Sequence, residues 1–151
     1  MKNILVTIDF DEYVELLIDR AFELAEMFKS KIWLMHIAEE ADTVGYGVGP
    51  QVGYVVGPLY IRDFKTKDFK KEHRLLQGYV DKLQKKGIHA EGLLMHGATI
   101  EMIIGESKKL NIDLIIAGHH KHGFIYNAFI GSVSEQIIKK SKIPILIVPF
   151  E

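Results

Sequence analysis

Short apolar runs alternate along this chain with longer stretches in which apolar residues recur every three or four positions. Most of the runs are rich in β-branched residues and lack alternating polar positions, which is typical of strands buried on both faces. The run over 88–95 differs, because it alternates and contains Gly92. The longer stretches have the period of amphipathic helices, as in Val14, Leu17, Ile18, Ala21, Leu24, Ala25 and Phe28. The pattern predicts strands over residues 4–8, 31–37, 88–95, 112–117 and 144–148, and helices over 14–28, 62–85, 98–110 and a stretch ending at 140 or 141.

Alternating strands and helices predict the α/β class, with βαβ units, an open parallel sheet and helices on both faces. A length of 151 residues suits one domain over 1–151. The pattern fails only at about 39–61, where glycines and prolines are concentrated. That composition is typical of a loop, so we interpret the segment as an insertion within the single domain.

The composition argues against several classes of function. The chain has no cysteine, which excludes disulfides, thiol catalysis and zinc–thiolate sites. A formal net charge of −1 argues against a broad nucleic-acid surface. No apolar run reaches the roughly 18 residues of a membrane span, and charged residues interrupt the first apolar run. We therefore expect a cytoplasmic protein without membrane or nucleic-acid partners.

Residues with binding chemistry follow the predicted strands. In open α/β sheets, ligands bind beyond the C-terminal strand ends, where neighbouring connections leave on opposite faces. Asp9 follows the first strand, His36 and Ile37 end the second, and a glycine-containing loop opens at Gly118 after the fourth. If the first and fourth strands are neighbours, Asp9 faces this loop. Glycines and small hydroxyl residues before a helix suit a phosphate, so a nucleotide or another anion is expected here.

Five motifs spread over the chain carry a family resemblance: ILVTID at 4–9, LMHI at 34–37, DLIIAG at 113–118, GSVS at 131–134 and PILIVP at 144–149. Through them the whole chain resembles the universal stress proteins. The resemblance implies a Rossmann-like fold of the adenine nucleotide alpha hydrolase type, with a five-stranded sheet in the order 3-2-1-4-5. It also implies homodimers joined through the last strand, between Pro144 and Pro149.

The nucleotide-binding motif is present in an altered form. Nucleotide-binding members of the family carry a pattern similar to G-x2-G-x9-G-[ST]; here Gly118 and Gly131-Ser132 match its ends, whereas Lys121 replaces the middle glycine. Lys121 either contacts phosphate through its ammonium group or prevents the close backbone approach that glycine allows. The Gly-His-His opening resembles members that do not bind ATP, although that branch usually lacks the GSVS segment found here.

The resemblance implies a role for each matching position. Asp9 would lie near the ribose or a bound Mg²⁺, and the backbone of Ile37 would meet the adenine edge. Thr7 and Ala117 would line the floor of the pocket. The phosphates of ATP or AMP would contact Gly118, Lys121, Gly131, Ser132, Val133 and Ser134.

The function that follows is a stress-response regulatory protein that binds ATP or AMP, with or without Mg²⁺, and has little or no catalytic activity. Slow ATP hydrolysis or autophosphorylation at Ser132 or Ser134 is compatible with the resemblance. The alternative is a nucleotide-independent homodimer that acts through protein contacts, with Lys121 closing the pocket.

Purely structural interpretations of the same residues stay open. Gly118 also suits a simple turn, and Asp9 competes with Asp11 to cap the first helix. Ser132 and Ser134 are plausible N-caps without any ligand. His119, His120 and His122 invite a metal site, but no carboxylate or cysteine in the loop completes a ligand set, so we expect solvated loop histidines and no metal centre.

Overall fold

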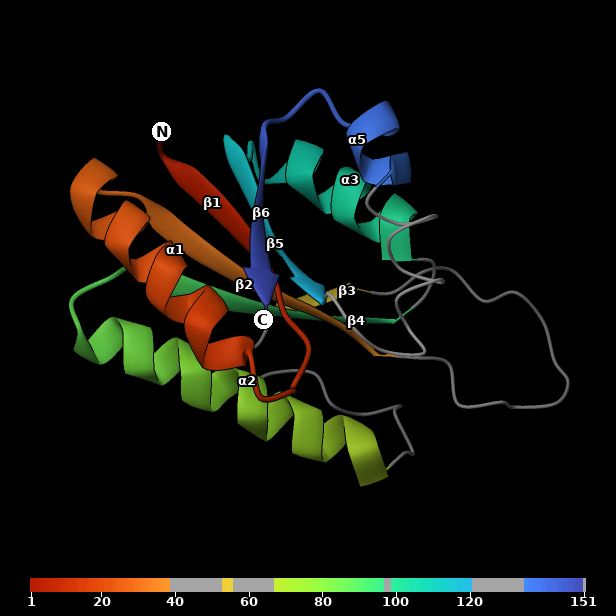
Figure 1. Ribbon diagram of the computed structural model, residues 1–151. Helices are drawn as coiled ribbons and strands as arrows, with labels where there is room; N and C mark the ends of the chain where they lie inside the picture. Colours follow the sequence, from red (N-terminus) through yellow and green to blue (C-terminus); the bar gives the residue numbers. More distant parts are fainter. Residues whose placement is uncertain (39–52, 56–66, 97–98, 121–134, 151) are drawn as a thin grey trace, which may run out of the picture.

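The computed structural model describes residues 1–38, 53–55, 67–96, 99–120 and 135–150. Within these residues one sheet is flanked by helices on both faces (Figure 1), so the predicted α/β domain is confirmed. The elements are, in chain order, β1 (Asn3–Thr7), α1 (Val14–Phe28), β2 (Lys31–Ala38), β3 (Gly53–Val55), α2 (Lys67–Lys85), β4 (Ala90–His96), α3 (Thr99–Lys109), β5 (Leu114–His120), α5 (Glu135–Lys140) and β6 (Ile145–Phe150).

The sheet has the order β3-β4-β2-β1-β5-β6. The five strands predicted from the sequence are β1, β2, β4, β5 and β6, and each pairs in parallel with its neighbour. The order 3-2-1-4-5 is therefore confirmed. One strand is additional: β3 pairs antiparallel with β4 and lies inside the glycine-rich segment that we interpreted as a loop.

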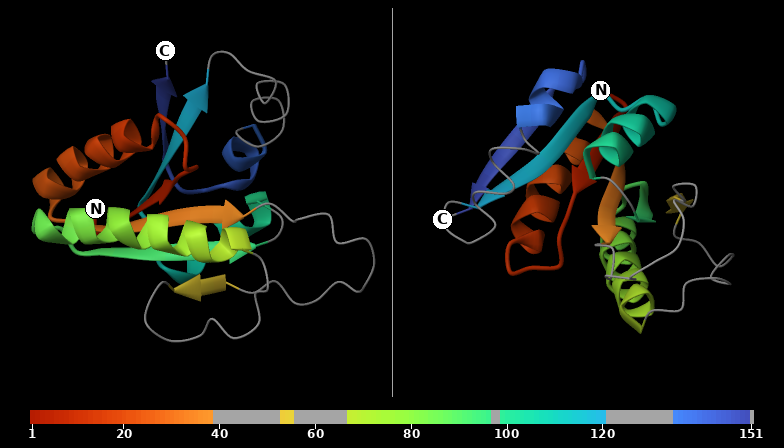
Figure 2. Two further views of the ribbon diagram at one scale, coloured as in Figure 1. Left: turned by 90° about the horizontal axis from the view of Figure 1, so that it is seen from below. Right: turned by 90° about the vertical axis from the view of Figure 1, so that its right-hand side faces the viewer.

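The central strand β1 separates two hydrophobic cores. Ile4, Leu5 and Val6 are completely buried. Ile4 and Val6 pack with α1 and α2, whereas Leu5 packs with α3 and α5 on the other face. The two layers of helices are visible from two directions in Figure 2. This division explains why the strand sequences lack polar alternation, because both faces of each inner strand are covered.

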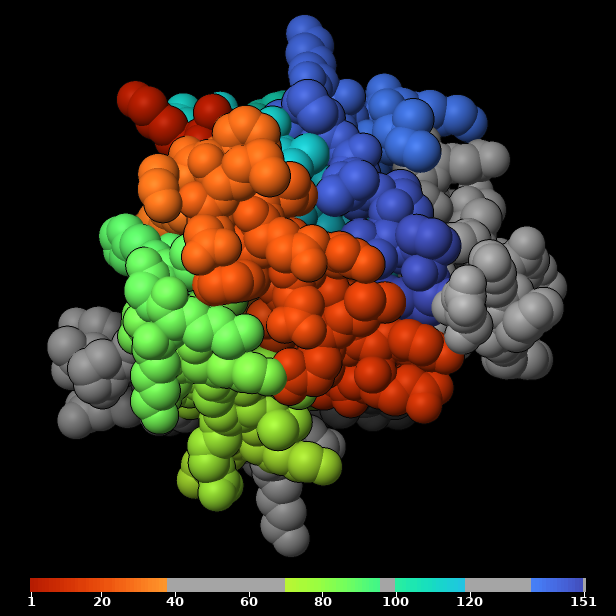
Figure 3. Space-filling model, turned by 60° about the vertical axis from the view of Figure 1, so that its left-hand side comes forward, coloured from red at the N-terminus to blue at the C-terminus, as the bar shows by residue number. Residues whose placement is uncertain are grey.

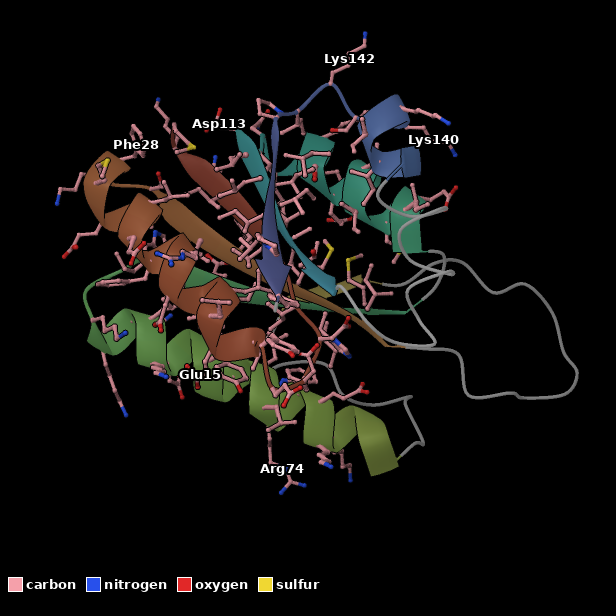
Figure 4. The ribbon with its side chains drawn as sticks, viewed as in Figure 1. Glu15, Phe28, Arg74, Asp113, Lys140 and Lys142 are labelled. Atoms are coloured by element: carbon pink, nitrogen blue, oxygen red, sulfur yellow. The ribbon has the colours of Figure 1, made fainter. Side chains whose placement is uncertain are left out.

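Helices α1 and α2 cover one face side by side. The apolar face of α1 is buried, and Lys29 ends the helix in the left-handed conformation with φ of 55°. Asp11 organises the turn before α1, because its Oδ1 accepts the Tyr13 N–H at 2.9 Å. Figure 3 shows the two helices in contact on this face. An ion pair between Glu15, labelled in Figure 4, and Lys82 joins them. None of the described helices is long and apolar enough to cross a membrane.

Asp113, at the end of the sheet where β1 and β5 begin, anchors the start of the chain (Figure 4). Its Oδ2 accepts the backbone N–H groups of Lys2 at 2.6 Å and Asn3 at 2.9 Å. In return, the Asp113 N–H donates to the Asn3 carbonyl at 2.9 Å. The Asn3 and Lys2 amides hold the pKa of the Asp113 carboxyl below its ordinary value, because they stabilise the charged form.

This hydrogen-bonded carboxylate makes stability depend on pH. Because its pKa is lowered by folding, Asp113 stabilises the protein above the unfolded-state pKa of about 3.9, and this contribution disappears as the pH falls through the folded-state pKa. We expect Asp113→Asn to lower the urea midpoint at pH 7 and to differ progressively less from the wild type below about pH 4. Urea unfolding followed by circular dichroism over this pH range measures both effects.

The matched control is Glu26→Gln, which removes one exposed carboxylate from α1. It should leave the urea midpoint nearly unchanged at both pH values. If the urea midpoint of Asp113→Asn stayed equally far below that of the wild type at acidic pH, the stabilisation would not come from the Asp113 charge, and the prediction would be wrong.

Candidate functional site

The C-terminal ends of β1, β2 and β5 meet at one edge of the sheet, because β1 pairs in parallel with both neighbours. From this edge the chain leaves β1 toward α1 on one face, whereas α5, which follows β5, packs on the opposite face. The hypothesis that the first and fourth predicted strands are neighbours is therefore correct. The gap between β1 and β5 is the topological switch point where α/β sheets bind ligands.

Thr7, Ile37 and Ala117 lie on the same face of the sheet at this edge. Thr7 follows Leu5 in the alternation of β1, and Ala117 follows Ile115 in β5; both preceding residues belong to the core beneath α3. Ile37 packs against the same core. All three are half-buried, and Thr7 Oγ1 is 3.4 Å from the Ile116 carbonyl oxygen. The structure thus groups three of the predicted site residues around the switch point.

Asp9 projects from the chain just beyond β1. The Ile8 N–H donates to the Met35 carbonyl at 2.8 Å, which keeps the chain alongside β2 up to this point. The Asp9 side chain is 63% exposed, and its Oδ1 lies 3.6 Å from His36 Nδ1. A carboxylate held at the strand ends and open to solvent is suited to accept hydrogen bonds from the hydroxyl groups of a ligand.

His36 is buried next to the backbone that leads into Asp9, a position that the sequence alone does not indicate. Its side chain is only 10% exposed. Nδ1 lies 2.9 Å from the Ile8 carbonyl oxygen, and the Phe10 ring packs on the imidazole with centroids 4.3 Å apart. His36 is therefore a buried polar group whose Nδ1 has a hydrogen-bond partner. In the sequence only its place near the end of a strand indicated a role, because its partners Ile8, Asp9 and Phe10 lie in the chain just beyond β1.

Gly118 lies within a strand, so its prediction as the first residue of a loop is wrong. β5 continues to His120, and Gly118 pairs with Val148 of β6. The predicted loop histidines His119 and His120 therefore belong to β5. A Cβ added to Gly118 would lie 2.1 Å from Cζ of Phe150. The glycine leaves room for this ring, which is 3% exposed and stacks on Tyr13 with centroids 4.5 Å apart.

The remaining predicted phosphate contacts, Lys121, Gly131, Ser132, Val133 and Ser134, lie outside the described residues, as does His122. Their roles stay predictions. In the described part of the chain, no three His, Asp or Glu side chains come together in an arrangement that could hold a metal ion.

Comparison with known proteins identifies the family. The model of the universal stress protein family matches residues 1–149. This chain belongs to that family. Universal stress protein YxiE of Bacillus subtilis is 27% identical and covers 97% of this chain, which in turn covers 98% of YxiE.

Solved structures of universal stress proteins have the same fold. One, in complex with cAMP, aligns with a TM-score of 0.68 at 17% identity and covers 98% of this chain and 96% of its own. Another, from Arabidopsis thaliana with AMP bound, aligns with a TM-score of 0.57 at 20% identity and covers 100% of this chain and 93% of its own.

Contact with Phe150 predicts a steric penalty at Gly118. Because the new methyl group would overlap the ring, Gly118→Ala should destabilise the protein by about 1–3 kcal/mol. In a Phe150→Ala background the ring is absent, so the same substitution should have little further effect. Urea denaturation of the single and double variants measures this coupling.

Gly105→Ala in α3 is the matched control, because a Cβ there meets nothing within 4 Å. It should stabilise the protein by about 0.5–1 kcal/mol through helix propensity. If Gly118→Ala were as harmless as Gly105→Ala, or equally harmful without Phe150, the packing explanation would be wrong.

Proposed function

We propose that this universal stress protein is a regulatory module that binds an adenine nucleotide, ATP or AMP, at the C-terminal ends of β1, β2 and β5. The observation that carries the proposal is the grouping of Thr7, Ala117 and Asp9 at the β1–β5 switch point. Two structures of the same fold with cAMP and with AMP bound support the choice of ligand class.

The described residues offer suitable partners for the nucleoside. The half-buried side chains of Thr7, Ile37 and Ala117 provide an apolar surface for a planar base, with the Ile37 backbone near the adenine edge. The exposed Asp9 carboxylate accepts hydrogen bonds from ribose hydroxyls, or contributes one oxygen ligand to a Mg²⁺ bound to the phosphates. Lys121 and the segment Gly131–Ser134 supply the phosphate contacts in this proposal.

We propose binding without efficient turnover. In this proposal the half-buried residues at the strand ends pack against the base, and Asp9 accepts hydrogen bonds from the ribose. Slow hydrolysis or autophosphorylation at Ser132 or Ser134 would then be a minor reaction. Conversion of ATP to ADP should accordingly be far slower than nucleotide exchange.

Ligand binding predicts thermal stabilisation. ATP or AMP at about 100-fold above its Kd should raise the Tm by about 5–10 °C, since it binds the folded state only. Asp9→Asn should weaken binding roughly 10- to 100-fold through loss of a charge-assisted hydrogen bond. Differential scanning fluorimetry and isothermal titration calorimetry, each with and without Mg²⁺, measure the two effects.

Asp19→Asn is the control for charge, because Asp19 lies on α1 and its partner is Lys86 at 3.8 Å. This variant should bind nucleotide like the wild type. Absence of a saturable shift at millimolar nucleotide would refute the proposal. In that case, binding gained in Lys121→Gly would indicate that Lys121 closes the pocket, as the second candidate function requires.

The second candidate is a nucleotide-independent homodimer acting through protein contacts, and the position of β6 at the edge of the described sheet favours it. β6 is the last strand of the sheet, and Leu146 and Ile147 are each 38% exposed. An edge strand with exposed apolar side chains is suited to pair with a second copy. The contact would extend from Pro144 to Pro149, and it is also compatible with nucleotide binding.

A dimer through β6 should dissociate when charge is introduced there. We expect the wild type to have twice the 17.2 kDa chain mass in analytical ultracentrifugation, and Ile147→Lys to be monomeric. Met27→Lys is the matched control, because Met27 is 73% exposed on α1, away from β6. A monomeric wild type at micromolar concentration, or a dimer unaffected by Ile147→Lys, would contradict this assembly.

A further inference from the structure

His36 stands behind the candidate nucleotide site. It belongs to β2, and its ring lies on the face covered by α1 and α2, whereas Thr7, Ile37 and Ala117 lie on the other face. The ring is enclosed by Phe10, which itself stacks on Tyr79 of α2 with centroids 6.4 Å apart. His36 is thus a buried polar residue close to Asp9, on the face of the sheet that α1 and α2 cover.

The hydrogen bond between His36 and Ile8 determines where the imidazole carries a proton. A carbonyl oxygen only accepts hydrogen bonds, so Nδ1, at 2.9 Å from the Ile8 oxygen, must be the donor. The Ile8 carbonyl belongs to the peptide bond that leads into Asp9. Because the Ile8 N–H also donates to Met35 at 2.8 Å, both backbone polar groups of Ile8 are bound to β2.

The same ring lies between two carboxylates. Asp9 Oδ1 is 3.6 Å from Nδ1, and Glu72 Oε1 of α2 is 3.7 Å from Nε2. The N–H at Nδ1 directs its positive end toward the side on which Asp9 lies, whether or not Nε2 carries a second proton. The attraction favours a conformation of Asp9 in which Oδ1 faces β2.

We infer that His36 is a positioning residue for Asp9. Through the Ile8 carbonyl it fixes the plane of the Ile8–Asp9 peptide, and through its Nδ1 edge it holds Oδ1 of the Asp9 carboxylate at the end of β2. This inference rests on the proposed nucleotide function for the ligand, but the orientation of Asp9 can be measured without a ligand.

The experiment compares two amides at position 36. Asn places its NH₂ group near the position of Nδ1, so His36→Asn preserves a donor to Ile8. Gln reaches instead toward the position of Nε2, so His36→Gln keeps the side chain polar without that donor. Adenine-nucleotide affinity by isothermal titration calorimetry should fall about five- to tenfold in His36→Gln and remain near the wild-type value in His36→Asn.

A double-mutant cycle separates positioning from general destabilisation. If His36 acts through Asp9, His36→Gln should cause no further loss of affinity in an Asp9→Asn background. His89→Gln, at the opposite end of the sheet with a 71% exposed side chain, controls for loss of a histidine and should leave affinity unchanged. Additive losses in the cycle, or equal affinities for His36→Gln and His36→Asn, would overturn the inference.

A ligand-free measurement distinguishes failure of this inference from failure of the proposed function. In NMR spectra of the protein without nucleotide, the Asp9 amide and carboxyl resonances should move in His36→Gln and stay near their wild-type positions in His36→Asn. Resonances that respond in this way in a protein that binds no nucleotide would support positioning and refute the nucleotide function. Unchanged Asp9 resonances in His36→Gln would refute positioning whatever the protein binds.

Discussion

The parallel pairing of β1 with both β2 and β5 is the constraint on which the rest of the molecule depends. With Ile4, Leu5 and Val6 completely buried, β1 has neither a free edge nor an exposed face along its centre. Because both pairings are parallel, the chain emerges from β1 beside the C-terminal ends of both neighbours. Asp9 reaches the strand ends for this reason. The connections that follow β1 and β5 lead to helices on opposite faces of the sheet, α1 on one and α5 on the other.

Much of the fold was predictable because most residues of the inner strands are apolar and the helices have a clear period. Prediction failed where a contact joins distant parts of the chain. Gly118 is typical of a turn by local rules, yet pairing with Val148 and packing of Phe150 keep it in a strand. β3 shows the same limit, because its partner β4 lies beyond α2 in the chain.

The candidate site was predictable to a similar degree. Alternation along β1 and β5 places Thr7 and Ala117 on one face, and a parallel neighbour brings Asp9 to the same edge. The relation of His36 to Asp9 was not predictable, because it passes through a backbone carbonyl that no residue type specifies. Asp113 is a parallel case: the motif shows a carboxylate, whereas its partners are two backbone amides at the start of the chain.

The stacked rings of Tyr13 and Phe150 join the two ends of the polypeptide. A contact of such wide sequence separation has a large loop-closure entropy, so its formation is unfavourable until the intervening strands have assembled. The ring also needs the space that Gly118 leaves, which exists only in a completed β5–β6 ladder. We therefore expect the aromatic pair to form late in folding, after β5 and β6 have paired in register.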